Sequence, residues 1–148
     1  MRRPKPPAAA PGSADDVEVE FYEALQRGDI DRLMGLWSDD DEISCVHPGG
    51  PRLVGAVAIR ASFDAMFANG TIDARPEKVR RLDAHSTAVH SVLERVRVFG
   101  REGEAFAYVV ATNVYVKATR GWRLVAHHAS PGTASEVPEV AETASVLH

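Results

Sequence analysis

Apolar residues in the first half of the chain recur every three to four positions, which is the spacing of one face of an α-helix. The first such run begins at Asp15 and closes at Gly28. Asp29 is predicted to cap a second, shorter helix, and a third is predicted over residues 55–67 with a stop at Gly70. The side chains expected to face the core from these helices are Val17, Phe21, Ala24, Leu25, Ile30, Leu33, Met34, Leu36, Trp37, Ile59, Phe63, Met66 and Phe67.

After Gly70 the apolar spacing shortens to two, as in a β-strand whose residues point alternately to opposite faces. Strands are predicted over residues 72–82, 87–99, 104–117 and 122–130, and glycine-containing turns separate the last three. A short strand is also predicted at residues 43–46, ahead of a turn at 48–51. Consecutive hairpins of this kind form an antiparallel meander.

Three helices followed by a long meander predict an α+β domain, in which the N-terminal helices pack on one face of a curved antiparallel sheet. The domain is expected to span residues 15–131, with a disordered tail at 1–14 and a mobile tail at 132–148. The strands at 87–99 and 104–117 carry apolar residues on both faces, so a monomer would leave one apolar face uncovered. We therefore predict a homodimer formed through that sheet face.

Composition narrows the function classes. The chain has 148 residues, of which 45% are hydrophobic and 26% charged, which is ordinary for a single globular domain. A net charge of −4 argues against nucleic-acid binding. The single cysteine, Cys45, excludes an intrachain disulfide and favours a cytoplasmic location, and no segment approaches membrane-spanning length.

One stretch, residues 37–55, combines a helix end, a short strand and a tight turn. His47 is placed at the end of that strand, immediately before the turn. Because histidine titrates near neutral pH, such a residue is a candidate general base, with a turn-capping histidine as the alternative.

Further polar residues lie on the predicted strands. Asn113 interrupts an otherwise apolar strand and is expected to line a pocket, with an interface or edge contact as the alternative. His127 and His128 are adjacent on a strand, so only one of them can face inward. His90 and Glu94 share a strand face and are interpreted as a surface pair in preference to a base with its orienting carboxylate. The ligand spacings typical of zinc sites are missing, so no metal is predicted.

Three motifs in order carry a resemblance: GDIDRLMGLWSDD at 28–40, VHPGGPRLVGAVAIRASF at 46–63 and GWRLVAHHASP at 121–131. The chain resembles the nuclear transport factor 2-like superfamily, and in particular its SnoaL-like branch. The resemblance implies a cone-shaped pocket between the helices and the concave side of the sheet, and dimerisation through the sheet. The residues implied to line the pocket are Tyr22, Trp37, Phe63, Met66, Asn113, His127 and His128.

Two members of the superfamily offer comparisons. In the ketosteroid isomerases a catalytic aspartate precedes a proline, and His47 with Pro48 stands in that position here. Those enzymes also use a tyrosine and a protonated aspartate to stabilise an enolate. The corresponding positions here hold Phe21, beside Tyr22, and Val110, so this comparison argues against ketosteroid isomerisation.

The last strands are similar to those of the association domain of calcium/calmodulin-dependent kinase II. Asn113 stands here in the position of an arginine of that domain. That comparison favours His127 as the inward histidine, whereas the isomerase comparison favours His128.

The hypothesis that follows is a homodimeric pocket protein that binds a small organic molecule and acts on it by acid-base chemistry without a cofactor. His47 would be the general base, and Asn113 with a histidine of the last strand would donate hydrogen bonds to a developing oxyanion. The alternative is a binding or assembly module without turnover.

Overall fold

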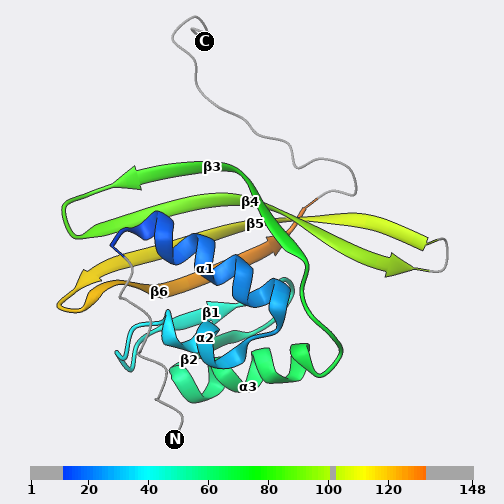
Figure 1. Cartoon of the computed structure of the whole chain (residues 1–148), viewed down its shortest axis with the longest axis horizontal. Helices are drawn as coiled ribbons and strands as arrows, with labels where there is room; N and C mark the ends of the chain where they lie inside the picture. The colour runs from blue at the N-terminus through cyan, green and yellow to red at the C-terminus, as the bar shows by residue number, and fades with distance from the viewer. Residues whose placement is uncertain (1–11, 101–102, 133–148) are drawn as a thin grey trace, which may run out of the picture.

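The computed structural model describes residues 12–100 and 103–132, which form three helices and a six-stranded sheet (Figure 1). The elements, in chain order, are α1 (Ala14–Arg27), α2 (Ile30–Gly35), β1 (Ser44–Val46), β2 (Arg52–Val54), α3 (Ala56–Phe67), β3 (Ala74–Asp83), β4 (Thr87–Gly100), β5 (Gly103–Ala118) and β6 (Gly121–Pro131). The α+β fold predicted from the sequence is confirmed.

The helices begin and end at residues whose chemistry favours those positions. Ser13 caps α1 by accepting a hydrogen bond from the Asp16 backbone N–H, so the helix begins at Ala14, slightly before the predicted Asp15. Gly28 ends α1 in the left-handed conformation, with φ of 65°. Asp29 caps α2 through the Arg32 N–H, as predicted.

The sheet has the strand order β2-β1-β6-β5-β4-β3. β3 to β6 form the predicted antiparallel meander, whereas β1 pairs with β6 in parallel, so the sheet is mixed. β2, which pairs with β1, was not predicted, because it is only three residues long and two of the three are exposed.

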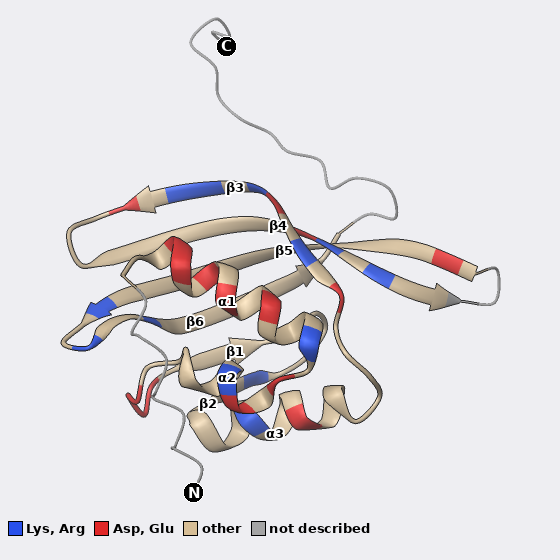
Figure 2. Cartoon of the chain, in the orientation of Figure 1, with Lys and Arg blue, Asp and Glu red and all other residues tan. Residues whose placement is uncertain are grey.

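Figure 1 shows α1 lying across the long strands, with α2 and α3 near β1 and β2. The predicted apolar stripes of α1 and α3 meet the concave side of the sheet, and Phe21, Phe63 and Leu124 are among the largest fully buried side chains. Acidic residues run along α1 and basic residues along β3 (Figure 2), and Arg81 of β3 contacts Asp15 of α1 at 2.7 Å.

The outer side of the sheet is partly apolar, as expected from the sequence. Val89, Leu93, Val110 and Val114 lie there half-buried, while their neighbours Ser91 and Thr112 are exposed. No helix among the described residues is long and apolar enough to span a membrane.

The predicted tails fall mostly outside the described residues, at 1–11 and 133–148.

Candidate functional site

A cavity of about 200 Å³ lies between α1, α3 and the concave side of the sheet. Its lining is mainly apolar, and its ionisable side chains are His47, Glu94 and His127. Space of this size would hold roughly seven water molecules, or an organic molecule of about ten non-hydrogen atoms. The apolar side chains that shape it include Phe21, Leu25, Phe63, Met66, Ile72 and Val96.

His47 follows β1 and enters the cavity from the side of α3. Its Nε2 lies 2.9 Å from Ser62 Oγ, and the Ser62 hydroxyl donates its own hydrogen to the Ile59 carbonyl at 2.7 Å. Ser62 Oγ must therefore accept from His47 Nε2–H, which leaves Nδ1 as the basic nitrogen of the neutral ring. Burial lowers the pKa of His47, so the ring is neutral and able to accept a proton at pH 7.

Glu94 lies on β4 and is the cavity residue that sequence reasoning missed. Its side chain is only 6% exposed, and burial raises its pKa to about 7. The negative charge of Glu18 raises this pKa further, whereas the hydrogen bond from Tyr22 lowers it. A carboxyl group with this pKa is divided between its acid and base forms at neutral pH, as a catalytic acid or base requires.

A chain of hydrogen bonds behind the cavity wall joins Glu94 to His127. The Tyr22 hydroxyl donates to Glu94 Oε2 at 2.6 Å, and Asn113 Nδ2 donates to the Tyr22 oxygen at 3.2 Å. Asn113 Oδ1 lies 2.5 Å from His127 Nδ1. Asn113 is thus fully buried and partnered on both ends of its amide, outside the cavity lining.

His127 is the inward histidine, and His128 is exposed. The reason is an irregularity in the pairing of β5 with β6, where Val114 faces Ala126 but Tyr115 faces Leu124. The extra residue reverses the alternation, so Leu124 and His127 are both buried on the concave side. Burial lowers the pKa of His127 to about 3, so its ring is neutral.

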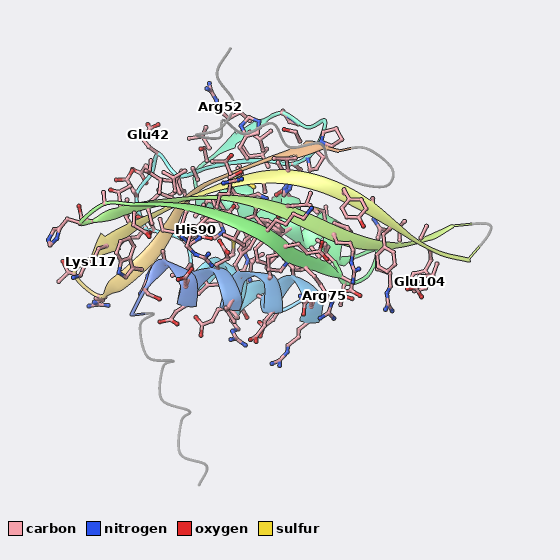
Figure 3. All side chains as sticks on the ribbon, turned by 90° about the horizontal axis from the view of Figure 1, so that it is seen from above. Glu42, Arg52, Arg75, His90, Glu104 and Lys117 are labelled. Carbon is pink, nitrogen blue, oxygen red and sulfur yellow. The ribbon has the colours of Figure 1, made fainter. Side chains whose placement is uncertain are left out.

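His90 and Glu94 are not the surface pair that the sequence suggested. Both are buried, because α1 covers their strand face (Figure 3). His90 Nδ1 lies 2.6 Å from Glu18 Oε2, and the same oxygen accepts the Tyr115 hydroxyl at 2.9 Å. This second cluster holds α1 to the sheet, apart from the cavity.

The other predicted pocket residues are divided between the cavity and its surroundings. Phe63 and Met66 line the cavity. Tyr22 stands behind its wall, bonded to Glu94. Trp37 packs in the core and bridges to Leu124, outside the cavity lining, so the structure does not bring it to His47.

The donors expected for an oxyanion are placed differently from the prediction. Asn113 does not reach the cavity, and the Nδ1–H of His127 is occupied by Asn113. Protonated Glu94 is the donor that the cavity offers.

Cys45 is buried beside β6 with its pKa raised by burial to about 12, so its thiol remains protonated. Among the described residues, no cluster of three or more His, Cys, Asp or Glu could hold a metal ion.

Comparison with known proteins places this geometry in a family. Residues 15–134 match the family model of the SnoaL-like domain. No curated protein matches the chain.

Solved structures show the same fold. One, from Thiobacillus denitrificans, is provisionally named a calcium/calmodulin-dependent protein kinase type II association domain; it is 30% identical, with a TM-score of 0.76, over 87% of this chain and all of that one. Another, from Streptomyces avermitilis, is provisionally named a dehydratase of the nuclear transport factor 2-like family; it is 32% identical, with a TM-score of 0.70, over 78% of this chain and 90% of that one.

The calcium/calmodulin-dependent kinase II hub of S. rosetta shares the fold. It is 23% identical, with a TM-score of 0.65, over 88% of this chain and all of that one. The chain therefore belongs to the SnoaL-like family of the nuclear transport factor 2-like superfamily.

Proposed function

We propose that this protein binds a small carbonyl compound in the cavity and catalyses proton transfer on it, as in a dehydration or an isomerisation, without a cofactor. The observation that carries the proposal is Glu94, a carboxyl group with a pKa of about 7 in the same small cavity as the neutral His47. The relative from Streptomyces avermitilis that is provisionally named a dehydratase agrees with this reaction class. A cytoplasmic location is part of the same proposal.

The two groups have complementary roles. His47 Nδ1 is the base that removes a proton from the carbon next to the carbonyl group. Protonated Glu94 is the acid that donates to the carbonyl oxygen, so that an enol forms in place of an unprotected enolate. In a dehydration the enol then returns its proton to Glu94, a carbon–carbon double bond forms, and the hydroxyl group on the next carbon takes up the proton held by His47 and leaves as water. The apolar lining makes the surroundings of both groups less polar than water, which strengthens both interactions.

This chemistry is tested by hydrogen exchange in heavy water. Cyclohexanone and 3-hydroxycyclohexanone have fewer than the roughly ten non-hydrogen atoms for which the cavity has space, and NMR would follow deuterium entering beside their carbonyl groups. We expect protein-dependent exchange, with a bell-shaped pH profile bounded below by the lowered pKa of His47 and above by about 7, where Glu94 loses its proton.

Glu94→Gln and His47→Gln should each slow the exchange by about 100-fold or more while the fold persists. Glu104→Gln makes the same chemical change at an exposed site on the β4–β5 hairpin and should leave the rate unchanged. Exchange no faster than in protein-free buffer, or an active Glu94→Gln variant, would contradict the proposal.

A second function, assembly without turnover, is favoured by the relative from Thiobacillus denitrificans that is provisionally named an association domain. Either function is compatible with a homodimer through the outer side of the sheet, which we also propose. Its support is the apolar pairs Val89 with Val114 and Leu93 with Val110, which are half-buried on that side.

A further inference from the structure

In the hydrogen-bond chain behind the cavity, each group can be assigned as donor or acceptor. These assignments determine which atoms of the cavity wall can accept a hydrogen bond from a ligand. A tyrosine hydroxyl has a single hydrogen, and that of Tyr22 goes to Glu94. Tyr22 therefore accepts from the Asn113 NH₂ group, which orients the amide so that its oxygen meets His127. His127 Nδ1 must then carry the hydrogen of the neutral ring.

As a consequence, Nε2 of His127 carries no hydrogen. This atom takes part in no hydrogen bond within the described residues, although His127 lines the cavity. Because a neutral imidazole carries one hydrogen, Nε2 is an acceptor that needs a donor from the ligand. An acceptor left without a partner in an apolar cavity is unfavourable, so a ligand with a donor at this point gains affinity.

The remaining ionisable groups of the cavity narrow the ligand further. His47 also presents an acceptor, Nδ1, because Ser62 occupies its Nε2–H. Among the described residues that line the cavity there is no lysine or arginine to neutralise an anion. Glu94 repels a carboxylate when ionised, and an apolar lining makes any charge costly to bury.

We propose that the cavity takes an uncharged ligand that donates a hydroxyl hydrogen to His127 Nε2, and that it discriminates against carboxylates and against ligands bearing only acceptors. This inference rests on the proposed function of the same site and names its substrate class, a neutral hydroxy carbonyl compound. Asn113 and Tyr22 are positioning residues in this arrangement, because they act through His127 and Glu94.

The test is a set of probes that share one ring and undergo no net chemical change in ordinary water: cyclohexanol, cyclohexanone, cyclohexanecarboxylate and cyclohexylammonium. Their dissociation constants would be measured by NMR titration at pH 8, where Glu94 is mostly ionised. We expect cyclohexanol to bind about five- to tenfold more tightly than cyclohexanone, which is the effect of one hydrogen bond. The carboxylate should bind most weakly.

Three results would overturn the inference. The first is a ketone or carboxylate that binds as tightly as the alcohol, and the second is no binding of cyclohexanol. The third is cyclohexylammonium binding more tightly than cyclohexanol, which would assign a cationic ligand. These titrations measure the affinity of each probe and not the rate of proton transfer. Their failure is therefore distinct from failure of the proposed function, which the exchange experiment tests separately.

A variant pair locates the preference. His127→Gln introduces an amide that can donate as well as accept, so the ratio of alcohol to ketone affinity should fall toward one. His128→Gln makes the same change at the exposed neighbour and should keep the wild-type ratio. A folded His127→Gln variant with the wild-type ratio would overturn the assignment, and the wild-type series decides alone if that variant does not fold.

Discussion

At the scale of single residues, the acidity of Glu94 results from opposed influences. Burial and the nearby charge of Glu18 raise its pKa, and the Tyr22 hydrogen bond lowers it. The bond lowers the pKa because a hydroxyl donor stabilises the carboxylate more than the carboxylic acid. The balance at about 7 therefore depends on a residue that does not itself line the cavity.

Tyr22→Phe removes that donor while keeping the ring, so we predict that the pKa of Glu94 rises above 7. A carboxyl-detected NMR titration would measure the change directly. The alkaline limb of the exchange profile should move to higher pH in step, since the acid form of Glu94 then persists further. Tyr108→Phe, on the outer side of the sheet, is the matched control. A Glu94 pKa that stays the same or falls in Tyr22→Phe would disprove this account.

Sequence reasoning located His47 correctly at the end of a strand and recognised that His90 and Glu94 share a face. It could not tell that α1 covers that face. Alternation along a strand predicts which residues point to the same side, but their burial depends on what packs against them. Here the partners come from α1: Tyr22 contacts Glu94 and Glu18 contacts His90, each across a sequence separation of 72 residues. Glu94, which lines the cavity, was therefore interpreted as a surface residue.

At the scale of elements, short irregularities position the site. The extra residue in β6 turns His127 inward, and the αL conformation of Gly28 reverses the chain between α1 and α2. A Cβ added at Gly28 would lie 3.2 Å from Thr71 Cγ2, so both conformation and space favour glycine there. Gly35, at the end of α2, has nothing within 4 Å of the corresponding point.

Two glycine-to-alanine substitutions should thus have opposite effects on stability. Gly28→Ala is expected to reduce the free energy of unfolding by about 1–2 kcal/mol, because it forces a side chain into the left-handed region. Gly35→Ala should raise it by about 0.5–1 kcal/mol, because alanine loses less backbone entropy in a helix. Urea unfolding of both variants measures the difference. Equal effects would show that the αL conformation of Gly28 is unimportant.

At the scale of the whole molecule, the two sides of the sheet have different chemistry. The concave side packs on the helices and lines the cavity, and the outer side presents half-buried valine and leucine between exposed polar residues. A stable dimer usually buries about 800 Å² on each partner, which a face of long strands can supply. The proposed homodimer would cover this side and leave the cavity unobstructed.

Light scattering across a dilution series should accordingly find a dimer for the wild type and a monomer for the double variant Leu93→Lys and Val110→Lys. The two residues are direct cross-strand neighbours, so two lysines there place like charges in the interface. Val57→Lys replaces an apolar residue that is 87% exposed on α3 and should leave the dimer intact. A monomeric wild type, or a double variant that stays dimeric, would exclude this interface.

By itself, the sequence determined the order and type of the helices and long strands, the caps at Asp29 and Gly28, and the apolar faces. These features follow from side-chain periodicity and local backbone preference, which act over a few neighbouring residues. The resemblance in three motifs was likewise sufficient for the family.

Only the tertiary structure decided which polar groups meet. The parallel pairing of β1 with β6, the irregularity that selects His127 over His128, and the burial of Glu94 beneath α1 all depend on contacts between distant segments. The pKa values that give the cavity its chemistry arise from desolvation and from neighbours across the fold. They exist once the chain has folded and are encoded in no local pattern.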